Sequence, residues 1–263
     1  MKKLQDKVAV FVGGGSAVAT IALKHFMDEG AKVLLVDVDE KYFDRSRQLR
    51  DEYPERIRTF IGACTCQGDM ERAMAFAEQE FGGIDILCNY AGFHGGGDIT
   101  TVLREQWRMD VTGLGIYRAV RAAYPYMKKH HYGRIMNFAS IGGRANRGVP
   151  VTYAGFKAAA IGLTRALALE LAADGITVNS MAPASLDTSA FERIPEKDSI
   201  PMQPPKGALK GGPGATRGGS FLPDRPGATL DEIAHVIVFM SSDDSAFLTG
   251  DCLDVNGGQF MQP

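Results

Sequence analysis

Val8-Ala9-Val10-Phe11-Val12-Gly13-Gly14-Gly15-Ser16 is the stretch that decides the fold. Its five apolar residues predict a strand that is covered on both faces, as in a parallel sheet. The three glycines predict a tight turn, and residues 16–29 predict a helix that ends at Gly30. Such a turn directs backbone N–H groups and a helix N-terminus at an anion. The stretch therefore favours an α/β fold with a phosphate site at this turn.

The same alternation of strand and helix continues along the chain. Further strands are expected at 33–36, 59–63, 84–89, 134–139, 177–181 and 252–255, and helices at 40–53, 70–81, 111–130, 152–173 and 230–240. Regular alternation of this kind requires parallel strands joined by right-handed crossovers. We therefore predict an α/β fold in which residues 1–263 form a single domain. Its core is one doubly wound, Rossmann-type parallel sheet with helices on both faces.

One long segment interrupts this alternation. Between residues 201 and 227 about half of the positions are Gly or Pro, so neither helix nor strand is expected there. A long loop in a compact domain is usually a lid, a binding loop or a disordered segment. Because it follows the strand at 177–181, we expect a substrate loop at about 190–228, on the ligand side of the sheet.

Composition limits the classes of function. A net charge of -2 gives no general attraction to nucleic acid or to an anionic membrane. The polar start of the chain does not resemble a secretory signal, and no apolar run reaches the ~20 residues that a membrane span needs. We expect a cytoplasmic protein. Reduced cysteines and no metal site are expected, because the spacing of the four cysteines does not suit a metal; these are Cys64, Cys66, Cys88 and Cys252.

Tyr153 and Lys157 lie four residues apart and therefore on one face of the predicted helix. Reduction of a ketone by hydride requires a proton donor at the nascent alkoxide, and a nearby ammonium lowers the pKa of a tyrosine that exchanges this proton. Ser140 ends the preceding strand, where its hydroxyl can bind the substrate oxygen. A tyrosine and a lysine at this spacing also occur by chance as a surface pair. The serine on the neighbouring strand favours a catalytic centre.

Asp37 closes the second predicted strand. An acid at this place accepts hydrogen bonds from the adenosine ribose, and its charge repels the additional phosphate of NADP. The alternative is that Asp37 is the N-cap of the following helix. The first interpretation predicts NAD as the cofactor.

The sequence resembles the short-chain dehydrogenase/reductase family over essentially its whole length. The first turn of that family reads Thr-Gly-x-x-x-Gly-x-Gly, whereas residues 12–19 here read Val-Gly-Gly-Gly-Ser-Ala-Val-Ala. The family's Asn-Asn-Ala-Gly is matched by residues 89–92, and its strand-six exit and closing turn by residues 179–184 and 254–258. The resemblance implies an NAD(H)-dependent oxidoreductase that interconverts a secondary alcohol and a ketone.

The resemblance also implies the roles of individual residues. Ser140 would orient the substrate, Tyr153 would act as acid and base, and Lys157 would also hold the nicotinamide ribose. The residues implied in binding the cofactor are Gly13, Ser16, Val18, Asp37, Cys64, Thr65, Asn89, Ala91, Tyr153, Lys157, Pro183, Leu186 and Thr188.

The resemblance places Asp110 at the position where the family has an asparagine that links the lysine, here Lys157, to water. An ionised Asp110 would pair with Lys157 and slow proton exchange, so that Asp110→Asn would raise turnover. The alternative is that Asp110 faces solvent and has no role.

Several positions depart from the family pattern: Ala17, Ala19, Cys64, Tyr90, Asp110 and Ala184. They allow a second hypothesis, a non-catalytic subunit that scaffolds an active homologue in a hetero-oligomer. A third, an NAD-sensing regulator, would need a partner surface that the sequence does not identify. Retention of serine, tyrosine and lysine together favours the enzyme.

The substrate loop carries Lys206, Lys210 and Arg217 and no acid between residues 199 and 222, and Arg144 and Arg147 follow the catalytic serine. These cations suit an anionic substrate, such as a carboxylate or an acyl-CoA. The alternative is a solvated lid whose charges only keep it soluble.

Oligomerisation is expected from the resemblance, as a homo- or hetero-oligomer that pairs through the helices at 111–130 and 152–173. The second of these helices is rich in small residues that would allow close approach. Burial of these residues within one subunit explains them equally well.

Overall fold

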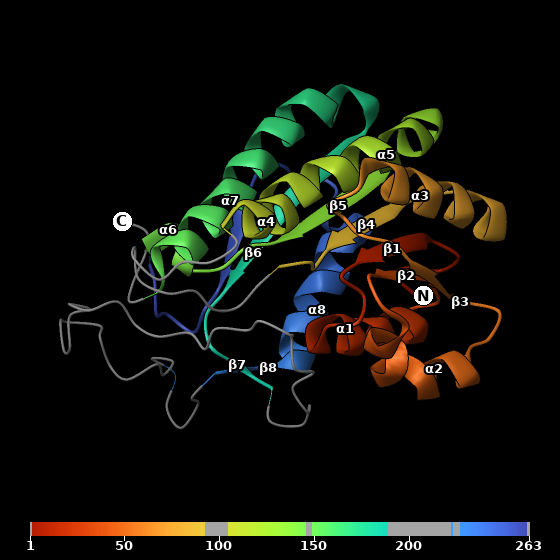
Figure 1. The fold of residues 1–263 in the computed structure, drawn as a ribbon, viewed down its shortest axis with the longest axis horizontal. Coiled ribbons are helices and arrows are strands. Elements are labelled where there is room, and N and C mark those ends of the chain that lie inside the picture. Colours follow the sequence, from red (N-terminus) through yellow and green to blue (C-terminus); the bar gives the residue numbers. More distant parts are fainter. Residues whose placement is uncertain (1, 93–104, 146–148, 189–221, 223–226, 262–263) are drawn as a thin grey trace.

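The computed structural model describes residues 2–92, 105–145, 149–188, 222 and 227–261. Its centre is a seven-stranded parallel sheet in the order β3-β2-β1-β4-β5-β6-β9 (Figure 1). The strands are β1 (Val8–Val12), β2 (Lys32–Asp37), β3 (Ile57–Ile61), β4 (Ile86–Asn89), β5 (Gly133–Phe138), β6 (Ile176–Pro183) and β9 (Cys252–Val255). The prediction of one doubly wound parallel sheet is confirmed.

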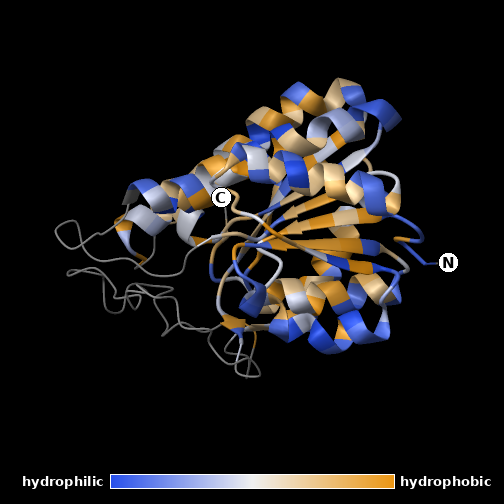
Figure 2. Cartoon of the chain, turned by 45° about the vertical axis from the view of Figure 1, so that its right-hand side comes forward, coloured by the Kyte–Doolittle hydropathy of each residue, from blue (hydrophilic) through white to orange (hydrophobic). Residues whose placement is uncertain are grey.

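Two layers of helices cover the sheet, and Figure 2 shows the apolar strands between them. One layer contains α3 (Gln67–Phe81), α5 (Gly115–His130) and α7 (Val151–Leu171). The other contains α1 (Ala17–Asp28), η1 (Glu40–Ser46), α2 (Arg47–Glu52) and α8 (Leu230–Ser241). The remaining short elements are α4 (Glu105–Met109), η2 (Asp110–Leu114), α6 (Gly142–Ala145), η3 (Ala172–Asp174), β7 (Leu186–Asp187), β8 (Ala228–Thr229) and η4 (Asp243–Ser245).

The first strand shows why its residues are apolar without alternation. Val10 and Val12 point into the core beneath α3, α5 and α7, whereas Ala9 and Phe11 point into the core beneath α1 and α8. All five residues of β1 are buried. A buried side chain of this size contributes roughly 1.5–3 kcal/mol, so burial on both faces fixes β1 at the centre of the sheet.

Three element predictions differ from the structure in detail. The helix expected at 40–53 is divided into η1, a 3-10 helix, and α2; the carboxylate of Asp39 caps the start of η1 by accepting from the amide of Lys41. The helix expected at 111–130 starts earlier, with α4, and passes through the π-helical turn η2 before α5. The strand expected at 59–63 is β3 at residues 57–61, an edge strand that is only partly buried and therefore has a weak pattern.

The chain changes direction across the sheet between β1 and β4, which are neighbours. The turn at Gly13 follows β1 and lies against Ala91, which follows β4. The carboxyl ends of neighbouring parallel strands at such a reversal form the usual ligand crevice of a doubly wound sheet.

Most of the expected substrate loop lies outside the described residues. Its two stems are described: β7 pairs in parallel with β8, and the amide of Ala228 donates to the carbonyl of Ser185. Both strands have only two residues and were missed in the sequence, because so short a pair leaves no periodic pattern.

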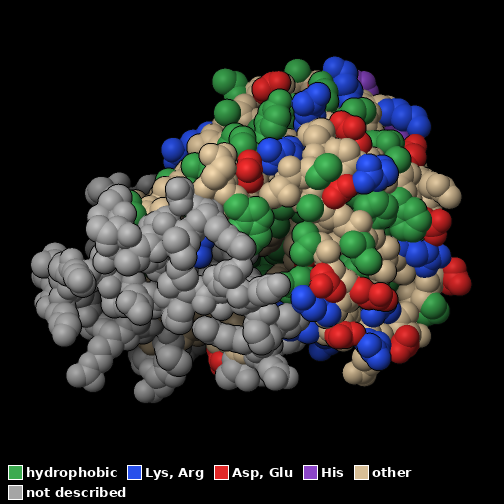
Figure 3. Space-filling view, viewed as in Figure 1, with side chains coloured by type: hydrophobic (Ala, Val, Ile, Leu, Met, Phe, Trp, Pro, Cys, Tyr) green, Lys and Arg blue, Asp and Glu red, His purple; other side chains and the backbone are tan. Residues whose placement is uncertain are grey.

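On the face shown in Figure 3, basic and acidic side chains are mixed over the described part of the surface. Exposed pairs such as Arg47 with Asp44, at 2.6 Å, contribute to this mixture. The described part of the chain contains no helix that is both long enough and apolar enough to span a bilayer.

Candidate active site

The glycine turn after β1 is built for close approach of backbone. Gly13 has φ +81°, and a Cβ on it would lie 2.5 Å from the amide nitrogen of Ala91. The amides of Gly13 and Gly14 both donate to the carbonyl of Val36, which fixes the turn on β2. Only glycine adopts this conformation without strain and leaves room for the neighbouring strand end.

The turn leads into the N-terminus of α1. Ser16 is the N-cap, and its hydroxyl accepts from the amide of Ala19. The amides of Ala17 and Val18 take no acceptor from the described part of the chain. Free amides at a helix N-terminus bind a pyrophosphate. Ala19 is fully buried and packs in the core beneath α1, so the methyl group at the family's third glycine is accommodated.

Asp37 ends β2 beside this turn. One of its carboxylate oxygens accepts from the amide of Gly15 at 2.9 Å, and the other accepts from the amide of Val38 at 2.9 Å. Burial raises the pKa of Asp37, and these two hydrogen bonds oppose the rise. The alternative that Asp37 is an N-cap is wrong, because Asp39 caps the next helical element.

Arg45 is a further residue at this turn. Its Nη1 donates to the carbonyl of Gly15 at 3.0 Å, so Asp37 and Arg45 hold the two sides of the same residue. No sequence pattern indicates this contact, because Arg45 lies thirty residues from Gly15 in a charged segment.

Two residues that the resemblance assigns to cofactor binding, Cys64 and Asn89, have side chains that contact other parts of the protein. Cys64 is buried in the core, with its thiol 3.9 Å from the carbonyl of Val111, while Thr65 beside it is half-buried on the turn after β3. The side-chain amide of Asn89 donates to the side-chain oxygen of Asn137 at 2.9 Å. The side chains of Cys64 and Asn89 are therefore part of the buried interior.

The next residue, Tyr90, stands where the family has a second asparagine. It is buried and packs edge-to-face on Phe11, with 5.1 Å between the ring centroids. This departure from the family pattern is a core substitution. Ala91 follows it at the switch point, half-buried beside Gly13.

The far end of the crevice is formed by the exit of β6. Pro183 is buried, and its carbonyl accepts from the amide of Ile141, which joins this exit to the end of β5. Leu186 is half-buried in β7 and Thr188 is exposed. These are the three residues that the resemblance assigns to the nicotinamide.

Ser140 and Tyr153 meet beyond the end of β5. Both are buried, and their side chains share a hydrogen bond. The hydroxyl of Ser140 also accepts from the amide of Gly142 at 3.1 Å. The serine and tyrosine predicted from sequence are therefore brought together.

Lys157 lies one helical turn beyond Tyr153. Its Nζ donates to the carbonyl of Phe138 at 2.6 Å and faces the end of β4 at Gly92. Burial lowers the pKa of Lys157 to about 8. The lysine thus occupies the crevice between the ends of β4 and β5.

The expected effect of Lys157 on the tyrosine is wrong for this structure. Burial raises the pKa of Tyr153, and the hydrogen bond from Ser140 opposes the rise. The ammonium of Lys157 donates to the carbonyl of Phe138, and burial is the largest influence on the pKa of Tyr153. The phenol is consequently protonated at neutral pH and suited to donate a proton.

The expected pairing of Asp110 with Lys157 is also wrong. Asp110 begins the π-helical turn, and its carboxylate pairs with Arg118 at 3.3 Å. Arg118 also donates to the backbone carbonyl of Asp110, so it contacts both the side chain and the backbone of that residue. Asp110 therefore has no ion pair with the lysine, and the reason for expecting Asp110→Asn to raise turnover is removed.

Arg144 is not a substrate cation. Its side chain is only 7% exposed, its Nε lies 3.1 Å from Asp254, and Nη2 donates to the carbonyl of Cys252. The other four cations of the proposed anion site, Arg147, Lys206, Lys210 and Arg217, lie outside the described residues.

Lys157→Met is expected to stabilise the protein near neutral pH. Because the pKa of Lys157 is lowered from 10.5 to about 8, the folded state binds fewer protons than the unfolded state between these values, and stability rises with pH in this window. Below pH 8 the buried ammonium costs roughly 3 kcal/mol, against about 1 kcal/mol for the hydrogen bond to Phe138.

Urea unfolding of Lys157→Met and wild type from pH 7 to pH 11 measures this difference. The variant should be more stable by roughly 2 kcal/mol at pH 7, with the advantage lost above pH 10.5, the unshifted value for lysine. Lys129→Met, at a side chain 63% exposed, is the control and should show no such dependence. A constant difference between variant and wild type across this range would contradict the lowered pKa.

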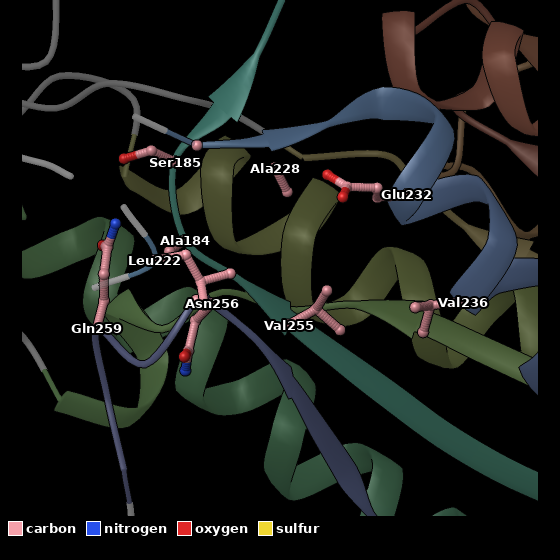
Figure 4. Close-up of a pocket in the computed structure, with 11 residues that line it drawn as sticks. Ala184, Ser185, Leu222, Ala228, Glu232, Val236, Val255, Asn256 and Gln259 are labelled. Carbon is pink, nitrogen blue, oxygen red and sulfur yellow. The ribbon is translucent and has the colours of Figure 1, made fainter. Parts of the chain in front are cut away.

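A cavity of about 200 Å³ lies next to the exit of β6 (Figure 4). Its described wall includes Ala184, Leu222, Val236 and Val255, with the polar side chains of Glu232, Asn256 and Gln259 at its border. Ser140, Tyr153 and Lys157 are not among the residues that line it. The cavity thus adjoins the exit of β6 and is separate from the side chains of Ser140, Tyr153 and Lys157.

Comparison with known proteins adds to this geometry. A family model described as enoyl-(acyl carrier protein) reductase matches residues 14–259. The (2S)-[(R)-hydroxy(phenyl)methyl]succinyl-CoA dehydrogenase subunit BbsD of Thauera aromatica is 32% identical, over 98% of this chain and 98% of its own. The 2-(S)-hydroxypropyl-CoM dehydrogenase 3 of Xanthobacter autotrophicus is 28% identical, over 97% of each chain.

A solved structure supports the same architecture. The crystal structure of levodione reductase superposes with a TM-score of 0.78, covering 97% of this chain and 98% of its own. At 23% sequence identity this likeness concerns the fold alone.

Proposed function

Because this chain belongs to the short-chain dehydrogenase/reductase family and is an oxidoreductase, we propose that it interconverts a secondary alcohol and a ketone with NAD(H) as cofactor. The observation that carries the proposal is the shared hydrogen bond of Ser140 and Tyr153, with the amino group of Lys157 one helical turn away at the same strand ends. A chain without catalysis would not need these three groups in one crevice.

In the proposed reaction, the bound nicotinamide supplies or accepts the hydride. The hydroxyl of Ser140 accepts from the amide of Gly142, and its one proton, which is donated to Tyr153 in this structure, would turn to the substrate oxygen when a substrate is bound. Tyr153 donates its proton to that oxygen as it becomes an alkoxide, and takes it back in the oxidation direction. Lys157 would hold the ribose, since its amino group lies at the strand ends beside Phe138 and Gly92.

The preference for NAD rests on Asp37. Its carboxylate lies 2.9 Å from the amide of Gly15, at the edge of the turn that would carry the adenosine. A 2′-phosphate on the ribose would be placed against this negative charge, whereas two ribose hydroxyls would donate to it. We propose that Gly13, Ser16 and Val18 hold the pyrophosphate and that Pro183, Leu186 and Thr188 hold the nicotinamide.

An anionic substrate, such as an acyl-CoA, remains part of the proposal. Two relatives support it by their names, since one acts on a succinyl-CoA derivative and the other on a coenzyme M conjugate. Lys206, Lys210 and Arg217 are the cations that would bind the anion.

We further propose an oligomer formed through α5 and α7. Tyr117 on α5 is 45% exposed and Leu169 on α7 is 85% exposed, which supports an apolar interface. Ala154 and Ala160 are buried within the subunit, whereas Ala158 and Gly162 are exposed and leave the surface of α7 flat. A cytoplasmic location agrees with four free cysteines, of which three are buried.

The proposal is tested by following the absorbance of NADH with a panel of ketones that includes 3-oxoacyl-CoA thioesters and small neutral ketones. Wild type should oxidise NADH with at least one member of the panel, and Ser140→Ala should lower that rate about a hundredfold. The anionic proposal expects the thioesters to react with the lower KM. No oxidation with any ketone, and no reduction of NAD by the matching alcohols, would favour a non-catalytic subunit.

A further inference from the structure

Arg144 lies in the short helix α6, four residues after Ser140. Its side chain reaches the last strand of the sheet, where it donates to the carbonyl of Cys252 and pairs with Asp254. The guanidinium also lies 5.9 Å from the ring centroid of Phe260. One buried side chain thus joins α6 to a strand and a turn more than 100 residues away.

The two glycines of α6, Gly142 and Gly143, pack against α7 at Tyr153 and Lys157. A Cβ on Gly142 would lie 3.1 Å from the ring of Tyr153, and a Cβ on Gly143 would lie 2.5 Å from the backbone of Lys157. With no side chain between them, α6 packs closely against α7 at this place.

The start of α6 also sets the direction of the serine hydroxyl. The amide of Gly142 donates to the oxygen of Ser140 at 3.1 Å, so the hydroxyl proton must point elsewhere, towards the tyrosine and the crevice. The position of this amide depends on where α6 is held, and the side-chain contacts that hold α6 to β9 are those of Arg144.

We propose that Arg144 is a positioning residue of the catalytic centre: by holding α6 to β9 and the C-terminal turn, it fixes the amide that orients Ser140. This inference rests on the proposed oxidoreductase activity. Arginine suits the task because its planar group reaches a carbonyl and a carboxylate at once, which the single ammonium of a lysine does not.

Arg134 provides a matched control. Its side chain is also 7% exposed, pairs with a carboxylate, Asp243, at 2.9 Å, and lies over an aromatic ring, that of Tyr132. Arg134 lies at the amino end of β5, whereas Ser140 follows the carboxyl end of that strand. Arg134→Met therefore removes an equally buried arginine without touching α6.

The test compares Arg144→Met, Arg144→Lys and Arg134→Met with wild type. Arg144→Met should lower kcat about tenfold and leave the KM for NADH within about twofold, because the cofactor turn is not altered. Arg144→Lys should lose less. Arg134→Met should lower thermal stability by a similar amount and leave kcat unchanged. In a Ser140→Ala background Arg144→Met should have no further effect on kcat, because the group that it positions is absent.

Hydrogen exchange of the peptide that carries the Gly142 amide gives a readout that needs no substrate. Exchange should be faster in Arg144→Met and unchanged in Arg134→Met. Equal kcat values for wild type and Arg144→Met, equal losses with and without Ser140, or unchanged exchange would each overturn the role of Arg144. An inactive wild type would overturn the proposed function alone, and the exchange result would still decide whether Arg144 holds α6. If Arg144→Met does not fold, Arg144→Lys decides by the same measurements.

Discussion

Tyr153→Phe is expected to reduce kcat on the order of a thousandfold, because it removes the hydroxyl that is proposed to transfer its proton to the substrate oxygen. The ring of phenylalanine fills the same buried space, so the packing against Gly142 is retained. Turnover measured with NADH and the best ketone substrate checks this expectation.

Binding of the cofactor separates this chemical loss from a structural one. The affinity of Tyr153→Phe for NADH should remain within a few-fold of wild type, since the hydroxyl is directed at Ser140 and the substrate. Thermal stability should change little, because the variant loses one hydrogen bond, worth about 1 kcal/mol. A variant that keeps more than a tenth of wild-type kcat would show that another group supplies the proton.

Gly13→Ala is expected to destabilise the fold by roughly 3 kcal/mol or more and to abolish tight binding of NAD. The left-handed conformation alone costs a residue with a side chain roughly 1–2 kcal/mol. The added methyl group would also lie 2.5 Å from the amide nitrogen of Ala91, so the turn or the end of β4 must move. Either movement would displace the amides of Ala17 and Val18 from the proposed phosphate site.

Gly82→Ala separates these two contributions. Gly82 has φ +85°, and a Cβ on it would meet nothing within 4 Å. It ends α3, far from the crevice, so this variant carries the conformational strain without the collision and should keep full affinity for NAD. Denaturant unfolding and NAD titration of both variants measure the difference. Equal losses of stability would contradict the close approach of β1 and β4.

Much of the fold could be predicted from the sequence because its signals are local. The apolar run of β1 and the glycines that follow it lie within one short stretch, and Tyr153 and Lys157 lie one helical turn apart. Asp37 could be assigned to the cofactor turn because the end of β2 must reach the same edge of the sheet as the end of β1.

The features that could not be predicted from the sequence depend on contacts between residues that are far apart in the chain. Nothing in the local sequence indicates that Arg45 holds Gly15, that Asp110 pairs with Arg118, or that Arg144 pairs with Asp254. From the sequence alone, Asp110 is expected to pair with Lys157 and Arg144 to bind an anionic substrate, and Arg45 has no expected role. A buried ion pair depends on which strands become neighbours, so it becomes visible only in three dimensions.

Calorimetric titration of the purified chain with NAD and NADH, and with NADP as the comparison, measures whether this chain binds the proposed cofactor. We expect binding of NAD or NADH with a Kd in the micromolar range and binding of NADP at least about tenfold weaker, because Asp37 would face the additional phosphate. Equal or tighter binding of NADP would contradict the assigned role of Asp37. No binding of either cofactor would contradict the proposed function itself, and would show that Ala17 in the phosphate turn abolishes cofactor binding.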